Sequence, residues 1–156
     1  MRTTAKPHGV SAPTVKFMKT DPKAVLPARQ HPTDAGFDLA SIEPARTLHP
    51  GDHAVFDTGI AVALPPNTVG LVYVRSSLGF KHGVTLSNSV GVIDHSFRGT
   101  LKVSLVHHGN ETISILPGDR IAQLVVTPLV SGLVSVEVES LDETDRGAGG
   151  FGSTGR

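Results

Sequence analysis

Short runs in which apolar and polar residues alternate constrain the fold of this chain more than any other feature. Leucine or valine occupies every second position from Leu101 to Leu105, and valine does so from Val134 to Val138. A period of two is typical of β-strands with one buried face. Pro, Gly, Asn and Asp form turn signals between the runs, at intervals of about ten residues. The sequence therefore predicts an all-β fold, built as a many-stranded antiparallel sandwich or barrel.

One short helix is expected within this pattern. The apolar run from Leu71 to Val74 predicts a strand, and the residues that follow, Ser76 to His82, favour a helical turn. Ser76 or Ser77 is suited to cap this turn, because a hydroxyl oxygen can accept a hydrogen bond from a free backbone N–H group. Since strands do not alternate with helices along the chain, a βαβ nucleotide-binding fold is not expected.

The two ends of the chain differ in composition from its middle. Residues 1–13 are polar and contain proline, which predicts a flexible extension, and one β-domain is expected over residues 14–145. Residues 146–156 hold five glycines, interleaved with Arg146, Phe151 and a Ser-Thr pair. A plain disordered tail is one interpretation. The other is a flap over an anionic ligand, in which glycine N–H groups and Arg146 meet the anion and Phe151 covers it.

Charge and composition exclude several classes of function. The 14 Lys and Arg residues balance 14 Asp and Glu residues, so net charge does not favour nucleic acid or an anionic membrane as a partner. The absence of cysteine excludes disulfides and thiolate chemistry. There is neither a secretory signal pattern near the start nor an apolar run of about 18 residues that could span a bilayer, so a cytoplasmic protein is expected.

Several common catalytic motifs are absent as well. Gly147, Gly149 and Gly152 have the spacing of GxGxxG, but they lack the preceding strand and following helix of a dinucleotide site. The phosphate loop, the serine-hydrolase elbow and the HExxH zinc motif do not occur. His49 and His53 are separated by proline and glycine, which break the helix that would bring both to one metal ion.

Four segments in the middle of the chain place polar residues where a ligand could meet them. DAGFDL, at residues 34–39, puts two carboxylates around a glycine, which suits a site or a simple Asx turn. RSSLG, at residues 75–79, ends a strand with a charge and two hydroxyls, a corner that suits phosphate. A polar turn at residues 87–90 leads through an apolar stretch to Asp94, which fits a functional carboxylate or a strand-ending turn. GDRIAQL places Gln123 in an apolar strand, where a buried amide needs a hydrogen-bond partner.

These segments, together with the tail, resemble those of a known family. DAGFDL, RSSLG, NSVGVIDHSFRG, GDRIAQL and RGAGGFGSTG occur in the order and spacing of the five motifs of the trimeric dUTP pyrophosphatases (dUTPases), over residues 34–155. The resemblance implies a jelly-roll-like β-barrel that forms a homotrimer, with three active sites at subunit boundaries, each closed by the tail of another subunit. It also implies hydrolysis of dUTP to dUMP and pyrophosphate with Mg²⁺, which limits uracil incorporation into DNA and supplies dUMP for thymidylate synthesis.

The resemblance further assigns roles to single residues. Asp94 matches the catalytic carboxylate, which takes a proton from the attacking water and contacts the sugar 3′-hydroxyl. Asn88 and the backbone around it would recognise uracil, and Phe97 would lie against the deoxyribose. Asp38 would hold Mg²⁺ through water, with the metal bound mainly by the triphosphate. The implied substrate-binding residues are Arg75, Ser76, Ser77, Gly79, Asn88, Gly91, Val92, Ile93, Phe97, Lys102, Gln123, Arg146, Phe151, Gly152, Ser153 and Thr154.

The chain departs from the family pattern in three places. Phe97 stands where Tyr is usual, Thr100 where Glu is common, and the second motif has Ser77 for Gly and Val74 for Pro. RSSL is also similar to the dCTP deaminases, but Ser104 occupies the position of their general-base Glu, so deamination lacks its base. The alternatives to a dUTPase are such a deaminase or bifunctional enzyme, or a regulatory nucleotide-binding protein. Cellular and viral sources fit equally well, and for a viral protein the expected compartment is the host cytoplasm.

Overall fold

The computed structural model describes residues 12–150, and these contain ten strands and one helix. Of the extension expected at residues 1–13, only the last two residues fall within this range. The elements in chain order are β1 (Lys16–Lys19), β2 (Gly36–Ala40), β3 (Arg46–Leu48), β4 (His53–Ala63), β5 (Thr68–Val74), α1 (Ser76–His82), β6 (Val84–Leu86), β7 (Gly91–Ile93), β8 (Thr100–His107), β9 (Ile113–Ile115) and β10 (Arg120–Pro128).

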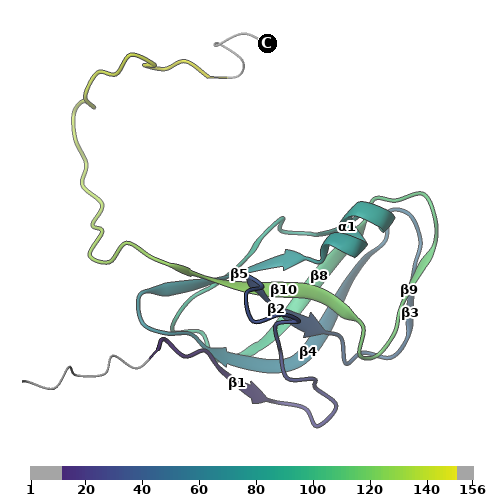
Figure 1. Ribbon diagram of the computed structural model, residues 1–156. Coiled ribbons are helices and arrows are strands. Elements are labelled where there is room, and N and C mark those ends of the chain that lie inside the picture. Colours follow the sequence, from purple (N-terminus) through teal and green to yellow (C-terminus); the bar gives the residue numbers. More distant parts are fainter. Residues whose placement is uncertain (1–11, 151–156) are drawn as a thin grey trace, which may run out of the picture.

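Every strand pairing in the described part of the chain is antiparallel. One sheet has the order β1-β4-β8-β6, a second has the order β2-β10-β5-β7, and β3 pairs with β9 in a small third sheet (Figure 1). Neighbours in these sheets are far apart in sequence, so long-range pairing holds the fold together. The prediction of a many-stranded antiparallel β-fold is confirmed.

Alternating burial explains how the two larger sheets share one core. Along β8, Leu101, Val103 and Leu105 are buried, whereas Lys102 between them is exposed. The apolar face of β8 meets side chains from the second sheet, among them Leu124 of β10, in one cluster of buried residues. The period of two in the sequence therefore predicted both the strand and its buried face.

Helix α1 forms where it was expected, but neither serine caps it. Arg75 is the N-cap residue, with φ −72° and ψ 143°, and its side chain makes no capping hydrogen bond. An N-cap residue keeps an extended backbone, and Arg75 does so because it directly continues β5. Ser76 and Ser77 therefore become the first two helical residues. With seven residues α1 is short, and no helix in the region 12–150 is long and apolar enough to cross a membrane.

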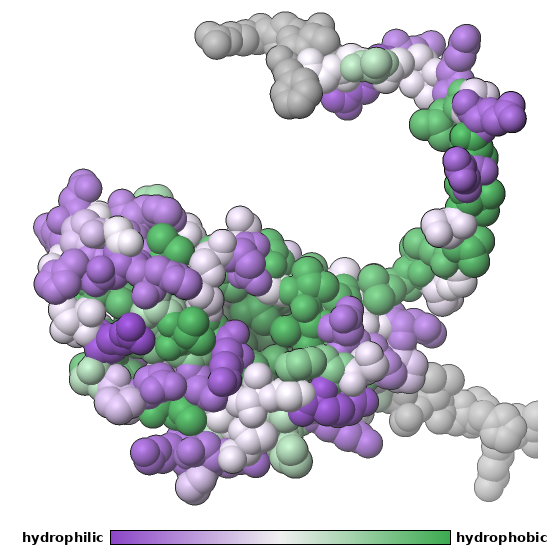
Figure 2. Space-filling model, turned by 180° about the vertical axis from the view of Figure 1, so that it is seen from behind, coloured by the Kyte–Doolittle hydropathy of each residue, from purple (hydrophilic) through white to green (hydrophobic). Residues whose placement is uncertain are grey.

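The strand predicted over Val134 to Val138 is wrong for the single chain. After β10 ends at Pro128, the chain leaves the sheets as an extended segment without strand pairing (Figure 1). The valines at 134, 136 and 138 are exposed, with 81%, 73% and 56% of their surface open to solvent. Figure 2 shows apolar side chains along this segment beyond the body of the molecule. An alternating pattern forms a strand only when a sheet edge pairs with it, and in the single chain no edge strand pairs with this segment.

Thr58 provides a test of how β4 is held against β8. The Thr58 side chain is fully buried, at the point where the register of β4 against β8 shifts. Its hydroxyl donates to the Leu101 carbonyl oxygen at 2.7 Å and accepts from the Ile60 N–H at 3.3 Å. Thr58→Val keeps the shape but leaves both partners unsatisfied, so we expect the free energy of unfolding to fall by about 1–3 kcal/mol. Urea unfolding at one fixed protein concentration measures this. Thr58→Ser, which keeps the hydroxyl, is the control and should lose less; a Val variant as stable as the parent would refute the role of the hydroxyl.

Candidate active site

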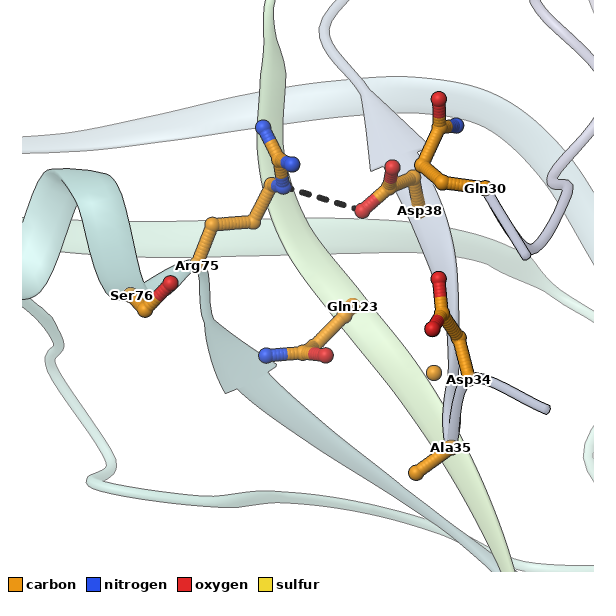
Figure 3. A pocket seen from close by; sticks show the side chains of 8 residues that line it. Gln30, Asp34, Ala35, Asp38, Arg75, Ser76 and Gln123 are labelled. Carbon is orange, nitrogen blue, oxygen red and sulfur yellow. Dashed lines mark ion pairs between the residues drawn. The ribbon is translucent and has the colours of Figure 1, made fainter.

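Three of the predicted segments meet at one pocket of about 250 Å³. Asp38 comes from β2, Arg75 and Ser76 from the junction of β5 and α1, and Gln123 from β10 (Figure 3). The sequence predicted a role for each of these four residues. The complete lining consists of Gln30, Asp34, Ala35, Gly36, Asp38, Arg75, Ser76 and Gln123.

Strand pairing explains why these residues converge. Gln123 lies directly opposite Asp38 on one side of β10 and opposite Tyr73 on the other. Facing residues of an antiparallel pair share one face of the sheet, so Gln123 and Asp38 both reach the pocket. The Gln123 amide nitrogen also donates to the Val74 carbonyl oxygen at 3.5 Å. The partly buried amide therefore finds the partner that its apolar surroundings required.

Asp38 is the electrostatic centre of this pocket. Its Oδ1 lies 3.0 Å from Arg75 Nε, and its Oδ2 accepts a hydrogen bond from an Arg120 terminal nitrogen at 2.9 Å (Figure 3 shows the Arg75 pair). Two guanidinium groups thus surround one carboxylate, and the Asp34 carboxylate lines the same pocket. Sequence reasoning missed Arg120, although it belongs to the GDRIAQL segment.

Sequence reasoning assigned no role to Gln30, and it left the Asp34 carboxylate either as part of a site or as part of a simple turn. Asp34 Oδ2 accepts a hydrogen bond from the His31 backbone N–H at 2.9 Å and lies 3.3 Å from His31 Nδ1, so it closes the turn that precedes β2. The backbone hydrogen bond, with a smaller contribution from the His31 ring, lowers the pKa of Asp34 below its usual value. The carboxylate therefore keeps its charge, and the turn its stabilisation, until the pH falls through this lowered pKa.

The remaining central residues form a second cluster on β7, on the turn that connects it to β6 of the other sheet, and on the turn after it. Ser89 adopts φ 62° in the connecting turn, and Asp94 follows β7 directly. The Phe97 N–H donates to the Asp94 carbonyl oxygen at 3.0 Å, which confirms a turn at the end of the strand. Arg98 fastens this turn, because one terminal nitrogen donates to the carbonyl oxygens of His95 and Phe97, both at 2.7 Å.

The two clusters are separated within one chain. Ile93, the last residue of β7, pairs with Gly70, which is five positions before Arg75 along β5 and its end. At about 3.3 Å per residue, Ile93 therefore lies on the order of 17 Å from the Arg75 end of the strand, and Asp94 lies one residue further away. The single chain does not bring the predicted catalytic carboxylate to the pocket that holds Asp38, Arg75 and Gln123.

Among the described residues, the others that the sequence singled out do not line this pocket. Lys102 lies on the opposite sheet and pairs with Asp57 at 3.9 Å, away from the pocket. Thr100, which replaces the usual Glu, shares a hydrogen bond of 3.0 Å with the Thr20 hydroxyl. Arg146 donates to the Gly149 carbonyl oxygen at 3.0 Å within the C-terminal segment, which runs away from the sheets (Figure 1). Ser77 and Gly79 lie on α1, Asn88 is in the turn between β6 and β7, and Gly91, Val92 and Ile93 form β7. Phe151, Gly152, Ser153 and Thr154 lie outside the described residues.

Comparison with known proteins identifies the family. The family model described as dUTPase matches residues 22–155. The chain belongs to the dUTPase family. It is 48% identical to the deoxyuridine 5′-triphosphate nucleotidohydrolase of Nocardia farcinica over 142 residues, covering 90% of this chain and 85% of the relative. It is 45% identical to that of Syntrophotalea carbinolica over 143 residues, covering 91% and 97%.

Solved dUTPase structures share the fold. The dUTPase of Staphylococcus bacteriophage 80alpha with dUPNHPP superimposes with a TM-score of 0.82 at 30% identity, covering 92% of this chain and 99% of that one. A variant of the phage phi11 dUTPase, in which coordination of a structural Mg(II) ion is described, superimposes with a TM-score of 0.73 at 26% identity over 83% of this chain and 99% of that one. Both similarities extend across most of the β-domain.

The donors in the pocket fit a metal that is held mainly by a ligand. Within residues 12–150, no three His, Asp or Glu side chains lie together as a metal cage. Each Asp38 oxygen contacts an arginine, but a carboxylate oxygen has a further lone pair that can accept from a metal-bound water. Mg²⁺ usually keeps several waters and uses one or two carboxylates together with substrate phosphates. Asp38 therefore suits contact with Mg²⁺ through water, as the dUTPase resemblance implied.

Gly36 provides a test of how Gln123 is positioned. A Cβ at residue 36 would lie 2.5 Å from Gln123 Oε1 and 3.0 Å from its Cβ. We therefore expect Gly36→Ala to displace the Gln123 amide and to lower the free energy of unfolding by about 1–3 kcal/mol. The NMR signals of the Gln123 side-chain amide should shift. Gly79→Ala is the matched control, since its new Cβ would meet Val74 at 3.4 Å; equal shifts in both variants would contradict this packing.

Proposed function

We propose that this chain hydrolyses dUTP to dUMP and pyrophosphate in active sites that copies of the chain share. Membership in the dUTPase family supports the reaction. The observation that carries the shared site is the distance between the two clusters, on the order of 17 Å along β5. An in-line attack needs its base next to the phosphorus, so a second copy must supply Asp94 to the pocket that holds Arg75 and Gln123.

The pocket of Asp38, Arg75, Ser76 and Gln123 is suited to the triphosphate. Arginine offers several donors to phosphate oxygens, and the Ser76 hydroxyl and the Gln123 amide add neutral donors. Asp38 would hold Mg²⁺ through water, and the ion when bound would neutralise phosphate charge and fix the chain of phosphates for attack. Because Asp38 and Asp34 balance the charges of Arg75 and Arg120, the bound Mg²⁺ would supply the excess positive charge that such an anionic ligand needs.

The second cluster, on β7 and the turns on either side of it, is suited to the base, the sugar and the chemical step. The Asn88 amide and the backbone of Gly91 to Ile93 can pair with the polar edge of uracil, and an amino group in place of the uracil carbonyl would leave buried groups unpaired. The ring of Phe97 packs against Gly99, where an added Cβ would lie only 2.7 Å from it, and offers an apolar face to the deoxyribose. Asp94 takes the proton of the water that attacks the α-phosphorus.

The exposed C-terminal segment supports a homotrimeric barrel of jelly-roll type. Apolar side chains from Leu129 to Leu141 are largely exposed, which is unusual for a folded chain in isolation. Pairing of residues 134–138 with a sheet edge of a neighbouring copy would cover these side chains and form the strand that their alternation predicts. The same path would deliver Arg146, Phe151, Gly152, Ser153 and Thr154 as a flap over a neighbouring site, with Arg146 at the γ-phosphate and Phe151 over uracil.

Mixing two inactive variants tests whether the site is shared. Asp94→Asn should bind the analogue dUpNHpp but lower kcat for dUTP by about 10²–10⁴-fold, because an amide cannot take the proton. Arg75→Ala should be inactive through loss of triphosphate binding. After unfolding and refolding together in equal amounts, about a quarter of the sites combine an intact Asp94 from one copy with an intact Arg75 from another.

The expected result is pyrophosphate release by the mixture at about a quarter of the wild-type rate. Each variant refolded alone is the control and should remain inactive. A mixture that stays as inactive as its components would show that one chain builds the whole site. Near-normal kcat in Asp94→Asn would instead remove Asp94 from its catalytic role.

Two truncations separate the flap from the assembly segment. A chain ending at residue 145 loses the flap but keeps the apolar segment, so we expect a folded homotrimer with little dUTP hydrolysis. A chain ending at residue 128 also loses the apolar segment and should no longer assemble as a stable trimer. Sedimentation velocity with a hydrolysis assay measures both properties. Identical oligomeric states in the two truncated chains would contradict assembly through residues 129–141.

A further inference from the structure

Arg120 contacts Asp38 beside the pocket. The family motifs assign it no role, and it is not among the residues that line the pocket. It is 41% exposed, whereas the Asp38 side chain that it contacts is 13% exposed. Its contact with Asp38 Oδ2 is a hydrogen bond of 2.9 Å, while the contact of Arg75 Nε with Oδ1, at 3.0 Å, is an ion pair only. The directed hydrogen bond to Asp38 therefore comes from Arg120.

A local irregularity of β10 brings Arg120 to this position. The register of β10 against β2 shifts between Arg120 and Ala122, so that Arg120 faces Ala40 and Ala122 faces Leu39. In a regular ladder Ile121 would face Ala40 and Arg120 would point to the opposite side of the sheet. The extra residue turns Arg120 to the face that carries Asp38 while Ile121 stays fully buried.

The hydrogen bond from Arg120 to Asp38 affects how Arg75 contacts the same carboxylate. Arg75 contacts Asp38 through Nε, so its two terminal amino groups are not used in that pair. An arginine and a carboxylate with two free oxygens tend to form a bidentate pair, which would use one of those amino groups. Arg120 holds Oδ2 and Arg75 contacts Oδ1, so a bidentate pair with Arg75 would have to share Oδ2 with the Arg120 donor. The terminal amino groups of Arg75 stay available for phosphate oxygens.

We propose that Arg120 is a positioning residue for triphosphate binding, which acts through Asp38 on Arg75. This role rests on the proposed dUTP hydrolysis and adds a residue to it. Removal of Arg120 frees Oδ2, lets Asp38 hold Arg75 in a bidentate pair and weakens the grip on the triphosphate. The base and the attacking water at the α-phosphorus are unchanged, so the affinity for dUTP falls more than kcat does.

Arg120→Met tests the proposal, because it removes the charge and the donor but keeps an apolar stem of similar length. We expect KM for dUTP to rise about tenfold or more, as for loss of a hydrogen bond to a charged group, with kcat within about threefold of wild type. The Kd of dUpNHpp in the presence of EDTA should rise in parallel, and the NMR signal of Arg75 Nε–H should shift. Arg120→Lys, which can place one donor on Oδ2, should restore most of the affinity.

Two controls separate this role from a general effect of charge or stability. Arg46→Met removes an exposed guanidinium from β3 in the small third sheet and should leave KM unchanged. In an Asp38→Ala background, Arg120→Met should add little further loss of affinity, since there is no carboxylate to hold. An equally large further loss would mean that Arg120 meets the phosphates directly, which would overturn the proposal.

The result for the wild-type chain distinguishes this inference from the proposed function. If the wild type hydrolyses dUTP and Arg120→Met has the same KM and the same Arg75 signal, only the positioning role is refuted. If the wild type releases no pyrophosphate from dUTP, the proposed function itself fails, whatever the Arg120 variants do. A rise in KM that Arg120→Lys reverses, together with a shifted Arg75 signal, supports both.

Discussion

The pairing of β10 with β2 on one side and β5 on the other is the constraint on which the pocket depends. It places Gln123 opposite both Asp38 and Tyr73, and it brings together three segments that lie far apart in the chain. A slip of one residue would turn Gln123 into the core and Leu124, which is fully buried, toward the pocket. Burial of Leu124 in the core therefore fixes the register of β10, and this register positions Gln123 and Asp38 at the pocket.

Charge within this pocket follows from the same arrangement. The protein as a whole is neutral, and two guanidinium groups and two carboxylates, Asp38 and Asp34, lie around the pocket where β2, β5 and β10 meet. Asp38 reduces the repulsion between Arg75 and Arg120 and at the same time restricts where each can reach. A site of this kind handles an anionic ligand through local geometry, and long-range attraction contributes little because the net charge is zero.

Much of this was predictable from the sequence, and the failures have physical reasons. Alternation predicted β8 and its buried face, and the polar segments predicted four residues that line the pocket. Arg120 escaped because its direction depends on a register shift in β10, which no residue pattern signals. The strand expected at residues 134–138 did not form because a period of two describes a strand's faces but not the presence of a partner.

The separation of Asp94 from the pocket also restricts how a complete site can arise. Rotation of side chains spans a few ångströms, far less than the distance along β5, which is on the order of 17 Å. Moving β7 would break its three residue pairs with β5 and separate Gly91 from Val72, against which it is closely packed. Association of copies requires no such break and also covers the apolar side chains of the C-terminal segment. Assembly is therefore the route that costs the fold least, and under the proposed function it would make dUTP hydrolysis depend on the oligomer.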